Sequence, residues 1–193
     1  MPSTACQKRG SFCQGYARRE HRTACRVEEI VGDTPQYLVF ENVEQVRKHV
    51  APLRAEGHTL VTTNGCFDLI HAGHIRYLSE AAAEGDILVV GINSDASVRK
   101  LKGPDRPVQS EKDRALIVAG LKSVSCSFLF GEDDPRAFLE VLKPDVHVKG
   151  GDYGEDIIEK PVVEAYGGKI SIVSFVPGRS TSEILRGIRG EKT

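Results

Sequence analysis

The sequence lacks several features that would assign its class at once. It contains no run of about 18 apolar residues, so no membrane-spanning segment is predicted. Neither sign of charge is in excess, since 26 Lys and Arg residues face 27 Asp and Glu residues and the formal net charge is −1. No global field therefore attracts nucleic acid or an acidic membrane, and we expect neither as a partner. Any anionic ligand must be held by local groups.

The cysteines lack the pairing that marks a metal or redox site. Their number is odd, their spacing is wide, and no C-x-x-C pair occurs. The sequence therefore predicts no metal site built from the protein's own side chains, and reduced thiols in a cytoplasmic protein are the simplest interpretation. The cysteines are Cys6, Cys13, Cys25, Cys66 and Cys126.

Residues 1–40 lack the apolar periodicity of the rest of the chain. Met1–Arg26 holds six basic residues against one acid, Glu20, and has no apolar core of a secretory signal. An Arg-rich, acid-poor start also fits a transit peptide, but a loosely ordered N-terminal extension is the preferred interpretation. Residues 41–193 are expected to form one domain of ordinary size.

Within this domain, short apolar runs alternate with segments of helical periodicity. The expected strands are 59–63, 86–92, 123–130, 145–149 and 169–176. The expected helices are 43–56, 72–84, 110–121 with Ser110 as its cap, 135–142, 162–166 and 180–188. This alternation predicts an α/β fold, a Rossmann-like doubly wound parallel sheet that is covered on both faces. Ligands of such sheets bind beyond the carboxyl ends of the strands, so the strand-to-helix loops are the places to search for a site.

The loop after the 59–63 strand carries two histidines three residues apart. If a helix begins near Ala72, His71 and His74 both lie at its N-terminal end, where free N–H groups and the helix dipole favour phosphate. Two imidazoles can there donate hydrogen bonds to the charge that develops on a phosphoryl group under attack. Gly73 is expected to leave room for phosphate oxygens between the two rings. A helix cap with two surface histidines is the alternative interpretation.

The segment G-C-F-D-L-I-H-A-G-H, at residues 65–74, resembles the signature of the cytidylyltransferase-like nucleotidyltransferases. The resemblance implies a nucleotidyltransferase fold in which His71 and His74 are catalytic, bind the nucleotide phosphates and stabilise the transition state. The other nucleotide-binding candidates here are Asn64, Gly65, Cys66, Phe67 and Gly73. Asn64 and Gly65 also permit a tight turn close to a ligand. Asp68 is a candidate for contact with the second substrate or a bound metal, or else a turn residue that caps the following helix.

The next strand-to-helix segment, 93–107, is rich in cations and is expected to form a loop. Beside a phosphate site these cations could clamp a triphosphate, whereas alone they would more often be a solvated charge run. The cations are Arg99, Lys100, Lys102 and Arg106. The resemblance favours the first interpretation, because relatives place a catalytic lysine in this loop. Lys102 is the catalytic candidate and Lys100 a nucleotide-binding one. Arg114 matches an arginine that faces the site in relatives, with a surface helix residue as the equal alternative.

A glycine-containing segment, K-G-G-D-Y, ends the 145–149 strand. Gly150 and Gly151 let the backbone pass close to a ligand. Asp152 could accept hydrogen bonds from sugar hydroxyls or position Lys149, which is a substrate-binding candidate. The segment resembles the nucleotide-side loop of the family, and a glycine turn with a solvated aspartate is the alternative.

The last expected helix begins with three hydroxyl residues. Ser180 and Glu183 fit a capping box. Hydroxyls and N–H groups at a helix start also bind phosphate, to which Arg179 adds charge. The family has a matching hydroxyl-rich motif that holds the triphosphate, so Arg179, Ser180, Thr181 and Ser182 are nucleotide-binding candidates.

Across about residues 60–189 the chain is similar to the heptose 1-phosphate adenylyltransferases of bacterial surface-sugar synthesis. N-S-D-A-S-V-R-K-L-K-G-P-D-R-P-V, V-K-G-G-D-Y and F-V-P-G-R-S-T-S are more specific to that group than H-x-G-H. The resemblance implies that ATP and a heptose 1-phosphate give ADP-heptose and pyrophosphate in the cytoplasm, with Mg²⁺ carried on the ATP phosphates. Many relatives are fused to a sugar kinase. No kinase-sized domain precedes this one, so a stand-alone transferase is expected, and a homodimer is an expectation because related enzymes often dimerise.

The implied reaction is an in-line attack of the sugar phosphate on the α-phosphorus of ATP, with His71, His74 and Lys102 sharing the developing charge. Three alternatives stay open. A cytidylyltransferase would use CTP with glycerol or ethanolamine phosphate. A tRNA ligase fragment is disfavoured by the short chain and the lack of a basic face. A non-catalytic regulatory module would bind ATP without turnover.

Overall fold

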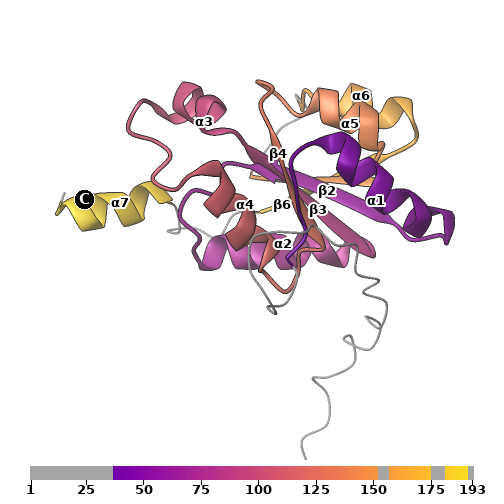
Figure 1. Cartoon of the computed structure of the whole chain (residues 1–193), viewed down its shortest axis with the longest axis horizontal. Coiled ribbons are helices and arrows are strands. Elements are labelled where there is room, and N and C mark those ends of the chain that lie inside the picture. The colour runs from indigo at the N-terminus through magenta and orange to yellow at the C-terminus, as the bar shows by residue number, and fades with distance from the viewer. Residues whose placement is uncertain (1–36, 152–156, 175–180, 191–193) are drawn as a thin grey trace, which may run out of the picture.

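The computed structural model describes residues 37–151, 157–174 and 181–190, and these build one parallel sheet with helices on both faces (Figure 1). The strands are β1 (Val39–Phe40), β2 (Leu60–Gly65), β3 (Ile87–Asn93), β4 (Cys126–Phe130), β5 (Val146–Gly150) and β6 (Lys169–Val173). The helices are α1 (Val43–Ala55), α2 (Ala72–Ala83), α3 (Asp95–Lys102), α4 (Glu111–Ala119), α5 (Arg136–Leu142), α6 (Lys160–Ala165) and α7 (Thr181–Arg189). The predicted α/β class with a doubly wound parallel sheet is confirmed.

Two apolar layers hold the helices to the sheet. Every residue of β3 is buried, and its side chains alternate between the layers. Leu88, Val90 and Ile92 face α2 and α4, whereas Ile87 and Val89 face α1, α5 and α6. This two-sided burial explains why the strand reads as a continuous apolar run and not as an alternating one.

The strand order gives the sheet a switch point near its centre. The order is β1-β4-β3-β2-β5-β6, so the chain winds outward from β2 through β3 to β4 and then returns to β5 on the other side of β2. The Tyr77 hydroxyl joins these two strands, since it donates to the Val148 carbonyl at 3.0 Å and bonds the Thr63 hydroxyl. In such a sheet the carboxyl ends of β2 and β5 form the ligand-binding switch point.

The expectation of a loop across residues 93–107 is wrong, because α3 occupies half of that segment. The Ser94 hydroxyl caps the helix by accepting from the Ser97 N–H at 3.2 Å, and the Glu111 carboxylate accepts from the Asp95 N–H at 2.7 Å. The helix ends at Gly103, whose φ of 97° suits glycine. Only two of its eight residues are buried, so its sequence has little apolar periodicity to detect.

The sheet begins slightly before the expected domain boundary. Val39 and Phe40, at the end of the segment assigned to the N-terminal extension, pair in parallel with β4. A strand of two residues leaves no pattern that a sequence reading detects. None of the helices among the described residues is both long and apolar enough to cross a membrane.

Candidate active site

The first histidine of the pair caps the helix that the sequence predicted. His71 has extended backbone geometry just before α2, and its ring Nδ1 accepts from the Gly73 N–H at 3.1 Å. The predicted start near Ala72 is confirmed. Because Nδ1 accepts this bond, the proton of a neutral His71 ring lies on Nε2, which is then a donor.

The two imidazoles do not leave the expected space between them. The rings of His71 and His74 stack with centroids 3.9 Å apart and an interplanar angle of 23°. Because the two ring faces are in contact, an oxygen can meet only their edges. Burial, and to a smaller extent the neighbouring His71, lowers the pKa of His74 to about 4. His74 is therefore a neutral hydrogen-bond donor at pH 7.

The tight turn expected at Asn64 and Gly65 lies farther along the chain. Both residues are the last of β2, and the left-handed residue is Phe67, with φ 44°. The Phe67 ring folds back over the strand end, so a Cβ on Gly65 would lie 3.0 Å from it. Asn64 contributes a buried side-chain oxygen that has no hydrogen-bond partner within the described residues. Such an orphaned acceptor at a strand end is a feature that a ligand can satisfy.

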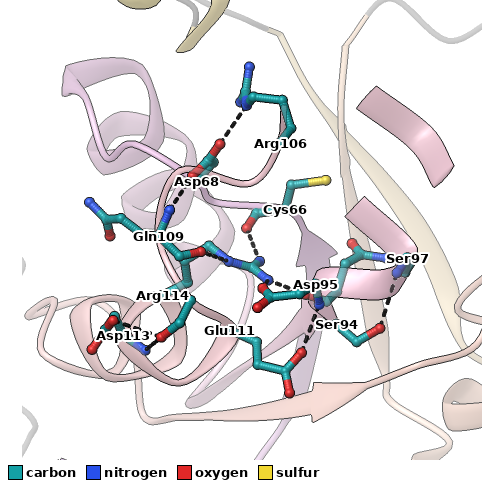
Figure 2. Close-up of polar contacts among 12 residues, drawn as sticks. Cys66, Asp68, Ser94, Asp95, Ser97, Arg106, Gln109, Glu111, Asp113 and Arg114 are labelled. Atoms are coloured by element: carbon teal, nitrogen blue, oxygen red, sulfur yellow. Dashed lines mark hydrogen bonds and ion pairs between the residues drawn. The ribbon is translucent and has the colours of Figure 1, made fainter. Parts of the chain in front are cut away.

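Arg114 is fully buried, in contrast to both interpretations drawn from the sequence (Figure 2). Its guanidinium donates to the carbonyls of Gln109, Cys66 and Asn93. A fourth bond, of 2.8 Å, reaches the Asp95 carboxylate at the start of α3. Arg114 is thus neither a surface residue nor open to a nucleotide. It joins the ends of β2 and β3 to the helix that carries the lysines.

Both carboxylate oxygens of Asp68 also accept hydrogen bonds from within the protein. Its carboxylate is 1% exposed and accepts from Arg106 Nε at 2.6 Å. The other oxygen accepts from the backbone N–H groups of Val108 and Gln109 at 2.8 and 3.1 Å. The expected contact with substrate or metal does not fit these engaged oxygens. The alternative as a helix cap is also wrong, because His71 caps α2.

The two candidate lysines of α3 have different surroundings. Lys100 forms an exposed 2.9 Å ion pair with Asp133, which follows β4. Lys102 is exposed, and no described residue pairs with it. Its charge acts on the Cys66 thiol, where it partly opposes the rise in pKa that burial causes. Lys102 is therefore close to the end of β2 and available to a ligand, whereas Lys100 is directed to another loop.

Lys149 lies near the end of β5 and pairs with a glutamate that the sequence did not single out. Its ammonium lies 2.6 Å from the Glu159 carboxylate, and these side chains are 15% and 3% exposed. Glu159 precedes α6, and no sequence signal distinguishes it from other glutamates. Gly150 ends β5, and Gly151 follows it with φ 129°, a conformation that favours glycine.

The start of α7 lies beside the histidine loop. The Thr181 hydroxyl donates to the Leu69 carbonyl at 3.3 Å, while Ser182 is exposed. This contact brings a segment from the far end of the chain next to the turn before α2. The candidates Asp152, Arg179 and Ser180 lie outside the described residues.

Comparison with known proteins identifies a family and several relatives of this chain. A family model described as cytidylyltransferase-like matches residues 62–185. The bifunctional protein HldE of Geotalea uraniireducens is 49% identical over 151 residues, which are 78% of this chain and 31% of that protein. HldE of Gluconobacter oxydans is 46% identical over 162 residues, which are 83% and 34% of the two chains. The chain thus spans about a third of the length of the curated relatives it matches.

Solved structures show the same architecture. The lipopolysaccharide core biosynthesis protein from Thermoplasma volcanium is 32% identical, with a TM-score of 0.52, over 62% of this chain and 98% of that one. Pantoate-beta-alanine ligase from Francisella tularensis is similar in fold alone, with 17% identity and a TM-score of 0.54, over 76% and 69% of the two chains.

Proposed function

The chain belongs to the cytidylyltransferase-like family of nucleotidyltransferases, and on that premise we propose that it transfers AMP from ATP to a heptose 1-phosphate, releasing pyrophosphate and giving ADP-heptose. The observation that carries the proposal is the pair of histidines at the start of α2, at the switch point of the sheet. The choice of adenine and heptose rests on the specific segments shared with heptose 1-phosphate adenylyltransferases. It is supported by the similarity to HldE and to a lipopolysaccharide core biosynthesis protein.

The site residues suit a reaction that needs charge stabilisation more than covalent chemistry. The nucleophile, a phosphate oxygen of the sugar, is already an anion, so no enzyme-bound intermediate is required. The Nε2–H of His71 and one N–H of His74 donate hydrogen bonds at the positive end of α2. Lys102 adds an exposed positive charge. Together these groups favour the negative charge that grows as the α-phosphorus is attacked.

The neutral state of His74 matters to this arrangement. With its pKa lowered to about 4, His74 is uncharged in the free protein, so the ring stacked on His71 carries no positive charge. The two rings can therefore remain in contact before the nucleotide arrives. A bound phosphate would favour protonation of an adjacent imidazole, because an opposite charge stabilises the charged form.

The described residues do not fit a magnesium ion held by the protein itself. No three side chains of His, Cys, Asp or Glu converge in the described ranges as such a site would require. Asp68, the predicted carboxylate ligand, has both oxygens engaged. We therefore propose that magnesium enters on the phosphates of ATP, and we place the reaction in the cytoplasm, where ATP is available.

The test is a pyrophosphate-release assay on the purified protein. ATP and CTP are each paired with the α and β anomers of heptose 1-phosphate and with glycerol phosphate. Release with ATP and one heptose anomer is the expected result. Release only with CTP and glycerol phosphate would keep the family and reject the heptose assignment. ATP binding with no release from any pair would favour a regulatory module.

A further inference from the structure

One arginine near the histidine loop has donors that the fold does not use. Arg106 lies between α3 and α4, and its side chain is 14% exposed. Its Nε donates to Asp68, but its two terminal nitrogens have no hydrogen-bond partner among the described residues. This differs from Arg114, whose guanidinium makes four bonds to the protein (Figure 2).

Asp68 holds this guanidinium in a fixed orientation. Its second oxygen is tied to the N–H groups of Val108 and Gln109, so the carboxylate cannot turn without losing buried bonds. In Figure 2, Asp68 lies between Arg106 and the backbone at Gln109. A guanidinium held through Nε alone still presents the donors of both terminal nitrogens, the fork that matches phosphate oxygens.

Through Asp68, Arg106 is joined to the segment that leads into His71. Its charge acts on the Cys66 thiol together with the charges of Lys102 and Arg114. The Arg114 guanidinium is fully engaged with backbone carbonyls and Asp95, whereas no described residue other than Asp68 pairs with Lys102 or Arg106. Asp68, which holds Arg106, is only three residues before His71.

We propose that Arg106 binds a phosphate group of a substrate in the active site, and that Asp68 is the positioning residue that orients it. The identity of the substrates rests on the proposed function. ATP and heptose 1-phosphate both supply the required chemistry, an anionic phosphate with several acceptor oxygens. A purely structural pair, in which Arg106 only neutralises Asp68, would affect folding and leave ligand affinity unchanged.

The test uses Arg106→Gln and Arg106→Lys, with Arg47→Gln as the matched control. Arg47 also donates its Nε to a carboxylate, that of Glu44 at 2.8 Å, but on the exposed face of α1. For each protein, KM and kcat are measured for both substrates, and the Kd of ATP and of heptose 1-phosphate by calorimetry. Thermal unfolding reports on stability separately.

Arg106→Gln should raise KM and Kd about 10- to 100-fold for one substrate, as expected for loss of a charge-assisted hydrogen bond. The substrate whose KM and Kd rise identifies the phosphate that Arg106 binds. A rise for heptose 1-phosphate indicates the sugar phosphate, and a rise for ATP indicates the triphosphate. Arg106→Lys should give a smaller rise, because it keeps the charge but loses the fork. In the wild type, added salt should weaken binding of that substrate more than in Arg106→Gln.

Asp68→Asn tests the positioning role. An asparagine oxygen can still accept from the two backbone N–H groups, but it no longer offers a carboxylate to Arg106. The affinity for the same substrate should fall, and the double variant with Arg106→Gln should be no worse than Arg106→Gln alone. A fully additive loss would overturn the positioning role.

Unchanged Kd and KM values in a folded Arg106→Gln protein would overturn the inference, as would a lower melting temperature with unchanged affinities. If the wild type binds but does not turn over, weaker binding by Arg106→Gln would support the inference while the proposed function fails. A wild type that binds neither ATP nor heptose 1-phosphate would overturn both.

Discussion

The buried guanidinium of Arg114 allows a quantitative prediction for Arg114→Met. Methionine keeps much of the apolar packing, so the cost comes mainly from lost polar contacts. The change leaves three backbone carbonyls, one buried and two partly buried, and the partly buried Asp95 carboxylate without their donor. Removing one partner of a buried, hydrogen-bonded charge costs about 3–5 kcal/mol of the free energy of unfolding. That is a large part of the total stability of a domain, which is about 5–15 kcal/mol.

Urea denaturation followed by circular dichroism measures this loss. Arg47→Gln is the control, since an exposed ion pair contributes only about 0–1 kcal/mol. Asp95→Asn removes one charge and keeps the arginine, so it should cost less than Arg114→Met and yield a folded protein for assay. If Arg114→Met stayed within about 1 kcal/mol of the wild type, the reasoning that this arginine ties the strand ends together would be refuted.

Three further predictions concern other buried polar groups. Burial lowers the pKa of His147 from 6.5 to about 3, so the unfolded chain binds a proton there that the folded protein does not. Stability should be full above about pH 6.5 and should fall as the pH drops toward 3, by up to about 1.4 kcal/mol per pH unit from this group, and His147→Phe should flatten the slope in urea titrations. Lys149→Met leaves the buried Glu159 carboxylate without its cation, so we expect the free energy of unfolding in urea to fall by about 3 kcal/mol. An added Glu159→Leu should recover part of this loss. Tyr77→Phe removes the hydroxyl between β2 and β5 and should lower the free energy of unfolding by about 1–2 kcal/mol, whereas no change would show that its two hydrogen bonds contribute nothing net.

The fold was largely predictable because its signals are local. A continuous apolar run such as that of β3 indicates a strand buried on both faces, and Ser110 marks a helix start on sequence grounds alone. The helix α3 was missed because only two of its eight residues are buried and because one of its two caps is tertiary. The Glu111 carboxylate on its first N–H group belongs to another helix and has no signature in the sequence.

The candidate site was predictable in its location but not in its internal bonding. The strand-to-helix loops and the helix start at Ala72 follow from periodicity and topology, and they bring His71, His74 and Lys102 to one end of the sheet. The roles of Arg114 and Asp68 follow from their burial. Some of the partners that bury and bond them are 40 or more residues away in the sequence, so their roles could not be predicted from local pattern. From sequence alone, charged residues in a loop are predicted to contact a ligand. Only the structure shows that their hydrogen-bond donors and acceptors already bind other parts of the protein.

The most direct test of the account follows the α-phosphorus of ATP. ATP labelled at the α-phosphate, and separately at the γ-phosphate, is incubated with heptose 1-phosphate and the wild-type protein, with His74→Ala in parallel. We expect the α label to appear in the sugar nucleotide and the γ label to leave as pyrophosphate. His74→Ala should slow both by about 100-fold or more, as for removal of a donor to developing charge. Transfer of the γ label to the sugar, or equal rates for the two proteins, would contradict the account.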